Sequence, residues 1–342
     1  MNRRGGTAVA AVLVAVSLLL SGCTVSHPDP GSGVDARAVL EAFKSRGMVD
    51  HLEALQRVAD ANGGNRASGT SGYEESARYV EEQLRAAGYS PVRQTFTYRR
   101  DGDGDGDSRG QQVKTFNILA DTEGSPDHTV VVGGHLDSVP GGPGINDNAS
   151  GVAAVLETAL WMAQTGIKPA NRVRFAFWGA EENTLDGSQH YIDELSASEI
   201  RQTALNLNAD MIASPNGVRS VNDGDGSDFG SGGPDGSKEI EALFFRYFQD
   251  NSLPAESTPL DGESDYEPFM AAGIAIGGLF TGDGEPKTAN QVQSFGGVAD
   301  AALDPCYHQR CDTPGNISPE LLKEMSGALA YATVSFAQAQ RN

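Results

Sequence analysis

Strand-like and helix-like segments alternate along most of this chain, and this alternation limits the folds open to it more than any other feature. Four short apolar runs are typical of buried strands, and they cover residues 115–120, 128–135, 171–179 and 204–212. Helical patterns follow them, for example over residues 148–166 and 237–251. This order predicts an α/β fold, with a mainly parallel or mixed central sheet and helices on both faces.

Length and composition indicate one large domain. Of the 342 residues, 39% are hydrophobic, which is enough for a substantial core, and we find no internal repeat. We predict that residues 1–22 are a signal peptide, residues 23–46 a tether and residues 47–342 a single domain. The formal net charge of -21 argues against nucleic acid and anionic lipid as electrostatic partners.

The N-terminus carries the pattern of an export signal. A basic segment, MNRRGG, precedes an apolar run, and the sequence Leu-Ser-Gly-Cys then ends at Cys23. That ending resembles a bacterial lipobox, in which the cysteine becomes the lipidated first residue. We therefore expect an exported protein that Cys23 anchors to the outer face of the bacterial cell membrane, or that is released outside the cell. The alternative is an ordinary signal peptide with an unrelated cysteine.

The other two cysteines, Cys306 and Cys311, lie close together in the sequence. An oxidising compartment favours a small disulfide loop between them. Ligation of zinc by the two thiols is the rival interpretation, but the chain has no second cysteine pair to complete such a site.

Potential metal ligands gather where the predicted strands end. In an open α/β sheet, the functional site lies outside the carboxyl ends of the strands. Histidine and carboxylate side chains occur there, or in loops that can reach there, at His135, Asp137, Asp147, Glu181, Glu182, Asp210 and His308.

Two adjacent glutamates, Glu181 and Glu182, follow a core strand. Two like charges at the end of such a strand are unfavourable unless a positive partner is present. Zn²⁺ accepts both imidazole and carboxylate ligands, and two ions can lie about 3.5–4 Å apart when a carboxylate bridges them. The sequence therefore predicts zinc as the partner, with one glutamate binding metal and its neighbour taking a proton from water.

Five motifs follow one another in a fixed order: GHLDS (134–138), GINDN (144–148), WGAEE (178–182), DMI (210–212) and CYH (306–308). With the flanking ANGGNRA, SDYEPF and GGLFTG, they resemble the secreted bacterial dizinc aminopeptidases, which are bridged co-catalytic zinc exopeptidases. Relatives of that family include glutaminyl cyclases and glutamate carboxypeptidases. The resemblance extends from about Leu52 to the terminal helix. It implies the zinc exopeptidase fold, which is phosphorylase/hydrolase-like.

The resemblance also implies a zinc-dependent aminopeptidase that holds two Zn²⁺ per chain and removes N-terminal residues from peptide substrates. His135 and Asp210 would hold one zinc, and Glu182 and His308 would hold the other. Asp147 would bridge the two ions.

Further roles follow from the same resemblance. Glu181 would be the general base and later the acid that protonates the leaving amine, while Tyr307 would donate a hydrogen bond to the oxyanion. Asp137 would orient the imidazole of His135, and a cis peptide bond would follow Asp147.

Met211 and Glu263 are the residues that the resemblance places at the substrate. Glu263 is a departure, because the family usually has arginine at this position in the sequence Gly-Arg-Ser-Asp. The substrate preference is therefore not carried over.

Two acidic segments look like calcium sites only superficially. Residues 101–107 read DGDGDGD, but the twelfth position of such a loop would be Gln112 instead of the glutamate that Ca²⁺ needs. We expect a solvated hairpin tip there, and we expect Asp223 and Asp225 to cap turns.

Two other functions are alternatives to the aminopeptidase. A glutaminyl cyclase-like zinc enzyme would use one zinc, whereas this chain has a full two-metal ligand set. A non-catalytic peptide-binding lipoprotein would be expected to lack Glu181 or a ligand, and none is missing. We expect a monomer that contacts the membrane only through its lipid anchor.

Overall fold

The computed structural model describes residue 1 and residues 33–44, 46–100 and 110–339. The predicted signal peptide, Cys23 and the acidic loop over 101–107 lie outside the described residues. In the part that is described, no helix has the length and apolar character needed to span a bilayer.

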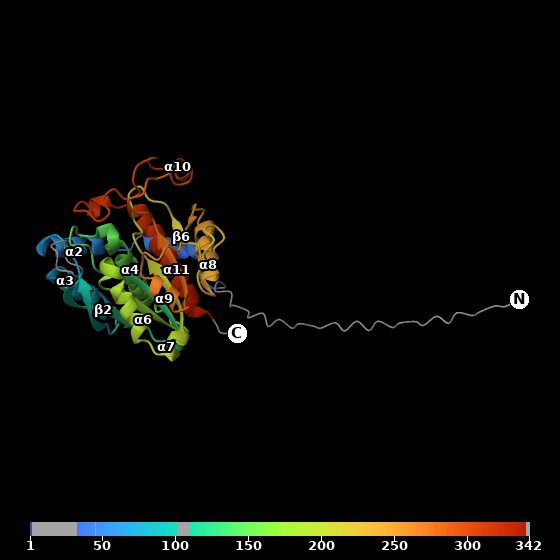
Figure 1. The fold of residues 1–342 in the computed structure, drawn as a ribbon, viewed down its shortest axis with the longest axis horizontal. Coiled ribbons are helices and arrows are strands. Elements are labelled where there is room, and N and C mark those ends of the chain that lie inside the picture. The colour runs from blue at the N-terminus through green and yellow to red at the C-terminus, as the bar shows by residue number, and fades with distance from the viewer. Residues whose placement is uncertain (2–32, 45, 101–109, 340–342) are drawn as a thin grey trace.

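A mixed sheet of eight strands forms the centre of the described part (Figure 1). Its spatial order is β1-β2-β4-β3-β5-β8-β6-β7. The strands are β1 (Val92–Arg100), β2 (Gln111–Asp121), β3 (Ser125–His135), β4 (Asn171–Trp178), β5 (Thr203–Ala209), β6 (Ser220–Asn222), β7 (Glu256–Thr258) and β8 (Ala275–Phe280). The predicted α/β class with a mixed sheet is confirmed.

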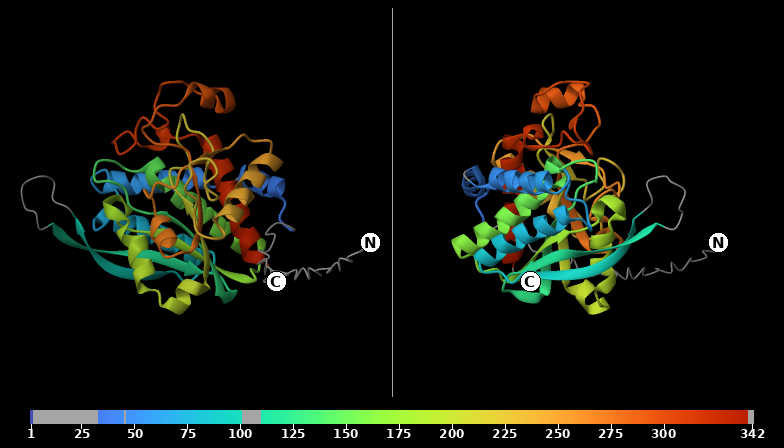
Figure 2. Two further views of the ribbon diagram at one scale, coloured as in Figure 1. Left: turned by 45° about the vertical axis from the view of Figure 1, so that its right-hand side comes forward. Right: turned by 90° about the vertical axis from the view of Figure 1, so that its left-hand side faces the viewer.

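Four central strands, β4, β3, β5 and β8, run parallel to one another. On one side, β2 pairs antiparallel with β4, and β1 pairs antiparallel with β2 as a long ribbon that Figure 2 shows reaching out from the body. On the other side, β6 is antiparallel to β8. The parallel centre places the carboxyl ends of its strands at one edge, where a site is expected.

Two layers of helices cover the sheet. One face packs against α1 (Ala36–Lys44), α2 (Met48–Ala61), α3 (Ser71–Ala86), α4 (Ser150–Thr165), α8 (Ser237–Asp250) and α11 (Pro319–Gln338). The other face packs against α6 (Asp186–Glu194), α7 (Ala197–Gln202) and α9 (Glu267–Ala271). The short helix α10 (Ala289–Phe295) stands clear of both layers in Figure 2.

Side chains on the central strands divide between these two cores because successive residues point to opposite faces. Val130 and Val132 belong to the larger core, whereas Val131 belongs to the smaller one. In the smaller core, Trp178 lies so close to β3 that a Cβ built at Gly133 would come within 2.5 Å of its Nε1 atom. The glycine in β3 is therefore what allows the indole to lie against the strand.

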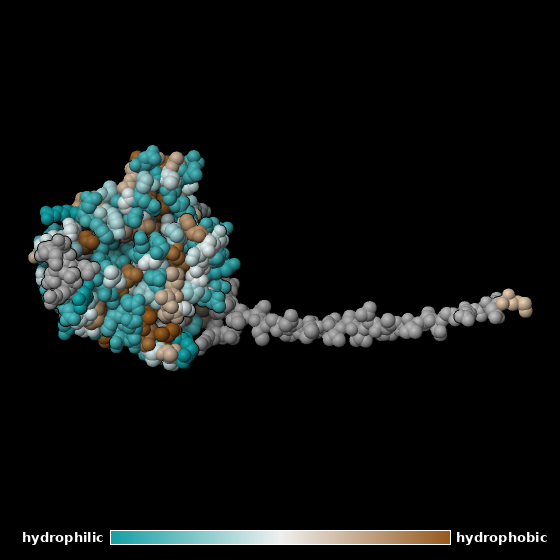
Figure 3. All heavy atoms as spheres, viewed as in Figure 1, coloured by the Kyte–Doolittle hydropathy of each residue, from teal (hydrophilic) through white to brown (hydrophobic). Residues whose placement is uncertain are grey.

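The surface agrees with the acidic composition. Figure 3 shows a face that is mainly hydrophilic, with apolar residues scattered over it. Apart from residue 1, the large apolar side chains that are exposed in the described part are Val92, Phe229 and Val298. Scattered single residues of this kind are normal on a protein surface.

The predicted tether over residues 23–46 is wrong in its last third. Ala36–Lys44 forms helix α1, which packs against α11 and buries Val39, Leu40 and Phe43 in the larger core. The apolar residues at helical spacing explain this, because they can bury one stripe of a short helix. The domain therefore begins before residue 47.

We predict that Phe43→Ala destabilises the domain by about 3–5 kcal/mol, because Phe43 is fully buried and meets Trp161 edge-on at 5.6 Å. Denaturant unfolding of the two proteins measures this. The matched control is Glu41→Ala on the same helix, whose exposed ion pair with Lys44 contributes at most about 1 kcal/mol. Equal effects of the two substitutions would show that α1 is not part of the folded core.

Candidate metal centre

Acidic side chains and an imidazole lie at the ends of three neighbouring parallel strands, at the same edge of the sheet. His135 is the last residue of β3, and Asp210 directly follows β5. After β4, the chain turns into the short helix α5 (Glu181–Thr184), which begins with the two adjacent glutamates. Because β3 pairs with both β4 and β5, these side chains meet without any long-range loop.

Asp147 lies between two imidazoles. Its Oδ1 atom is 3.2 Å from Nε2 of His135, and its Oδ2 atom is 3.1 Å from Nε2 of His308. Asp147 belongs to the irregular helical turn η1 (Ile145–Ala149) ahead of α4. One carboxylate therefore uses both oxygens to link residues that are far apart in the sequence.

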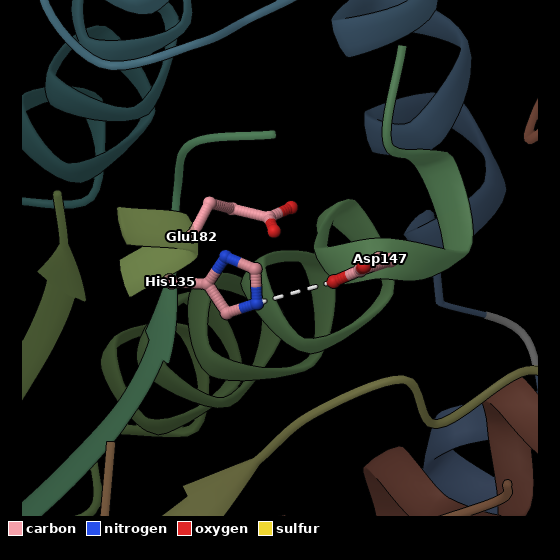
Figure 4. Close-up of side chains that lie close together, drawn as sticks. All are labelled: His135, Asp147 and Glu182. Atoms are coloured by element: carbon pink, nitrogen blue, oxygen red, sulfur yellow. Dashed lines mark ion pairs between the residues drawn. The ribbon is translucent and has the colours of Figure 1, made fainter. Parts of the chain in front are cut away.

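Each imidazole also faces a second carboxylate. Nε2 of His135 is 3.3 Å from Oδ1 of Asp210, and Nε2 of His308 is 3.0 Å from Oε2 of Glu182. Figure 4 shows Asp147, His135 and Glu182 pointing toward one another from separate segments. The structure thus brings together all five residues that the sequence analysis assigns to metal binding.

The donor atoms of this cluster fit zinc. In tetrahedral coordination with metal–ligand bonds of about 2.0–2.1 Å, ligand atoms lie about 3.3 Å apart, which is close to the distances above. Oε1 of Glu182 and Oδ1 of Asp210 are buried in the described structure and accept no hydrogen bond. Buried carboxylate oxygens without donors are costly, and a bound cation would satisfy them.

Burial and crowding perturb the acids of this centre. Burial, with the neighbouring charge of Asp147, raises the pKa of Glu182 to about 7. Burial also raises the pKa of Glu181 well above its usual range. Although burial opposes its ionisation, Asp147 keeps a pKa well below the usual range because His135 and His308 both bond to it. Opposed shifts of this kind among neighbouring acids are typical of functional sites.

Glu181 lies beside the ligands but is set back from them. Its Oε2 atom is 3.8 Å from Nε2 of His135, a longer distance than those from the imidazole to Asp147 and Asp210. Its backbone N–H donates to Oδ1 of Asp137 at 3.3 Å. The two adjacent glutamates therefore take different places, with Glu182 against one imidazole and Glu181 nearer the other.

The sequence analysis expects Asp137 to orient the ring of His135. In the structure, Nδ1 of His135 lies 3.2 Å from the backbone carbonyl oxygen of Asp137 and 3.8 Å from its carboxylate. The backbone of this residue is thus closer to the ring than its side chain. The carboxylate is also engaged by the N–H of Glu181, as described above.

The sequence analysis missed Asp312, which holds the bridging residue in place. Its carboxylate accepts the N–H of Asn146 at 2.8 Å and the N–H of Asp147 at 3.1 Å. Asp312 follows the disulfide between Cys306 and Cys311, whose predicted pairing is present. Its place at the end of the segment CYHQRCD does not reveal this role, because its partners are backbone amides of a distant loop.

Ser264 and Asn208, which the sequence analysis also missed, support Asp210. The hydroxyl of Ser264 donates to Oδ2 of Asp210 at 2.6 Å, and the amide of Asn208 donates to that hydroxyl at 2.8 Å. Asp265, which follows Ser264 in the sequence, is fully buried, and burial raises its pKa to about 7. These serine and aspartate residues belong to the segment SDYEPF, which had been quoted without a role for them.

Unusual backbone geometry is concentrated at the centre. Ala180, Met211 and His308 have φ values of 59°, 46° and 59°, a region that residues other than glycine rarely adopt. The first precedes Glu181, the second follows Asp210 and the third is a predicted ligand. The peptide bond between Asp147 and Asn148 is cis, as the family resemblance implied. Positive φ at three residues beside one cluster of side chains is typical of a functional site.

A cavity of about 640 Å³ opens onto the cluster. Its lining includes the ligands, Glu181, Tyr307, Met211 and Glu263. The ring of Tyr307 stacks on that of His308 at 3.8 Å between centroids, whereas Glu263 is exposed at the rim. The predicted catalytic and substrate residues thus share one space with the predicted ligands.

A second acidic group, which is not part of the cavity lining, consists of Asp223, Asp225 and Glu241. Asp223 accepts the backbone N–H groups of Ser227 and Phe229 at 3.1 and 2.8 Å. It therefore caps a turn, as the sequence analysis expected.

Fold and site together define an α/β protein with a cluster of histidine and carboxylate side chains at the carboxyl edge of a mixed sheet. The family described as Peptidase family M28 matches residues 117–333, and the chain belongs to that family.

Two relatives illustrate how far the similarity extends. The chain is 43% identical over 284 residues to leupeptin-inactivating enzyme 1 of Streptomyces exfoliatus, a match that covers 82% of this chain and 59% of that protein. It is 47% identical over 236 residues to the probable lipoprotein aminopeptidase LpqL of Mycobacterium tuberculosis, covering 67% of this chain and 47% of that protein. The chain thus spans about half the length of the curated relatives it matches.

Solved structures share the fold at low sequence identity. An aminopeptidase from Aneurinibacillus sp. strain AM-1 superposes with a TM-score of 0.69 at 18% identity, covering 90% of this chain and 97% of that one. A glutaminyl cyclase from Porphyromonas gingivalis gives a TM-score of 0.61 at 17% identity, covering 84% of this chain and 99% of that one. At these identities, the likeness establishes the fold alone.

We predict that the metal-free protein loses thermal stability as the pH rises from about 4 to about 8. Glu182, Asp265 and Asp312 each have a pKa raised to about 7, with burial as the main cause. Carboxyl groups in an unfolded chain have a pKa of about 4, so the folded protein binds more protons between these values. Stability therefore falls with rising pH across that window.

Thermal unfolding in the presence of chelator at several pH values measures this dependence. Asp265→Asn keeps the size of one buried acid and removes its titration, so the fall should become shallower in that variant. Bound zinc should reduce the fall as well, because cations compensate the acids. A metal-free protein that becomes more stable across the window would contradict the prediction.

Proposed function

We propose that this protein is a metalloaminopeptidase that removes N-terminal residues from peptides with two zinc ions. The observation that carries the proposal is the position of Asp147, with one oxygen facing each of two histidines that each face a further carboxylate. Relatives with aminopeptidase in their names support the reaction class. The general test is hydrolysis of aminoacyl-anilide substrates with and without a chelator.

The proposed ligands are His135 and Asp210 for one ion, Glu182 and His308 for the other, and Asp147 between them. Bound there, zinc would supply a Lewis acid that polarises the scissile carbonyl and lowers the pKa of water to about 7.

Glu181 is the residue proposed to transfer protons. It lines the cavity beside the proposed ligands, and burial raises its pKa well above the usual range, a perturbation typical of residues that transfer protons. In the proposed reaction, its carboxylate takes a proton from the attacking water and returns it to the leaving amine. The carboxylate of Glu182 contacts the imidazole of His308 and is therefore less available for this proton transfer.

Tyr307 lines the same cavity, and burial raises the pKa of its hydroxyl above the usual value. The hydroxyl therefore remains a hydrogen-bond donor, suited to the oxyanion that forms on the substrate. The acidic lining would also accept the free α-ammonium of a peptide, which an aminopeptidase must recognise. A glutaminyl cyclase-like reaction or a non-catalytic role is less favoured, because Glu181 and the full ligand set are retained.

We predict about two zinc ions per chain, because His135 with Asp210 and His308 with Glu182 form two donor pairs that Asp147 joins. Elemental analysis of the desalted protein measures the content, and a chelator should abolish hydrolysis until zinc is restored. Full activity with no more than one tightly bound metal would be incompatible with the two-zinc proposal.

Glu181→Gln and Glu182→Gln should separate the two adjacent acids. The first substitution removes the proposed base and should lower kcat at least about 100-fold while zinc is retained. The second removes a ligand oxygen and should weaken binding of one zinc. If both variants keep their metal and near-normal activity, the proposed division of roles is wrong.

The proposed role of Glu263 concerns selectivity. Its exposed position at the cavity rim, where the family usually has arginine, adds negative charge near the substrate. Glu263→Arg should shift kcat/KM by about fivefold from substrates with Arg or Lys toward those with Glu, because exposed charges interact weakly. Glu123→Arg makes the same charge change on an exposed residue outside the cavity lining. Identical substrate rankings in both variants would remove Glu263 from the substrate site.

Lipid anchoring through Cys23 is part of the proposal and draws support from the relative named as a lipoprotein. Cys23→Ser should move the protein from the membrane fraction to the medium without changing its specific activity. Fractionation of cells that express the two forms measures this. Unchanged partitioning would indicate an ordinary secreted protein.

A further inference from the structure

Arg66 is a fully buried arginine that lies behind the metal centre, in the loop between α2 and α3. Its guanidinium donates hydrogen bonds to three backbone carbonyls: to Pro143 at 2.9 Å, to Gly144 at 2.6 Å and to Leu136. Its own backbone N–H donates to the hydroxyl of Ser138 at 2.9 Å. All four partners belong to the connection between His135 and Asp147.

These contacts secure both ends of that connection. Leu136 directly follows the ligand His135, and Gly144 lies three residues before the bridging Asp147. Gly144 has a φ of 62°, and a Cβ there would come within 2.3 Å of the carbonyl oxygen of Asp147. The connection forms no sheet ladder or regular helix before η1, so Arg66 supplies hydrogen bonds that secondary structure supplies elsewhere.

The same loop also reaches the segment that carries the glutamates. The hydroxyl of Ser68 accepts the N–H of Ala180 at 2.7 Å, directly ahead of Glu181. Residues 66–68 therefore contact the chain next to His135, Asp147 and Glu181. A single short loop supports three of the segments that build the site.

The charged guanidinium of Arg66 is buried and bonded to backbone carbonyls, without a carboxylate partner in the described structure. Within the described structure it forms no ion pair, although Asp137, Asp312, Asp147 and Glu182 are close enough for their charges to favour its protonated form. Burial lowers its pKa to about 10, so it stays charged at neutral pH. A buried cation bonded only to carbonyls is costly, and the acids in front of it offset that cost.

We infer that Arg66 is a positioning residue for the zinc centre, one that holds the His135–Asp147 connection in its metal-binding geometry and sets a fixed positive charge behind the acids. The inference rests on the proposed function for its metal. Residues that orient ligands in this way typically affect metal affinity about 10- to 100-fold.

The test compares Arg66→Met and Arg66→Lys with the wild type and with Arg174→Met. Arg174 is a partly buried arginine paired with Asp121 at 2.6 Å, away from the ligands, and provides the matched control. Zinc affinity is measured by competition with a chelator, and the visible spectrum of the cobalt-substituted protein reports ligand geometry. Arg66→Met should bind zinc at least about tenfold more weakly and change the cobalt spectrum.

Arg66→Lys keeps the charge but not the three-way donor geometry, so it should recover only part of the zinc affinity. Arg174→Met should lose thermal stability and keep the wild-type affinity and spectrum. If Arg66→Met also loses only stability, the inference is overturned. If Arg66→Met does not fold, Arg66→Lys decides, and wild-type affinity and spectrum in that variant would overturn the inference.

Hydrogen exchange of the metal-free protein separates this inference from the proposed function. Amides of residues 144–147 should exchange at least about tenfold faster in Arg66→Met or Arg66→Lys than in the wild type, since their segment loses its support. A wild type that binds no zinc would overturn the proposed function, whereas the exchange rates would still decide whether Arg66 positions this segment. Unchanged rates would overturn the inference.

Discussion

Repulsion among buried carboxylates is the constraint on which the rest of this structure depends. Asp147, Glu181, Glu182 and Asp210 converge at the carboxyl edge of the sheet, and the described positive groups in contact with them are imidazoles. Such a group of acids is unstable alone, because burial favours their neutral forms. The fold tolerates the cost because a large two-layer core stabilises the sheet beneath it. The acids thus lower the stability of the fold at one edge of the sheet, where the proposed cations would bind.

The supports of the centre act on backbone as much as on side chains. Asp312 binds two amides next to the bridging residue, and the carbonyl of Asp137 lies against a ligand imidazole. The disulfide between Cys306 and Cys311 closes the short loop that carries Tyr307 and His308. Side chains supported in this way have little freedom to move, so the protein itself holds the proposed ligands near one another. This is the preorganisation that metal sites and catalytic sites share.

The sequence predicts the clustering of the proposed ligands because parallel strands end at one edge, which turns residues at strand ends into spatial neighbours. His135, Glu182 and Asp210 could be grouped on that basis. Asp312 and Arg66 could not, because their partners are backbone atoms of a loop whose course the sequence does not reveal. Helix α1 was missed for a different reason: its few apolar residues follow a Pro- and Gly-rich stretch, and only packing against α11 shows that they are buried.

The positions of the two tryptophans make the two faces of the sheet distinguishable by fluorescence. Trp178 pairs with His135 across β4 and β3, and its indole lies against Gly133. The other tryptophan of the chain, Trp161, packs against Phe43 in the opposite layer. Each side of the sheet therefore contains one of the two tryptophans. Emission from Trp178 reports events at the strand end that bears the histidine, while emission from Trp161 reports the docking of α1, and single Trp→Phe variants would resolve the two signals without an added dye.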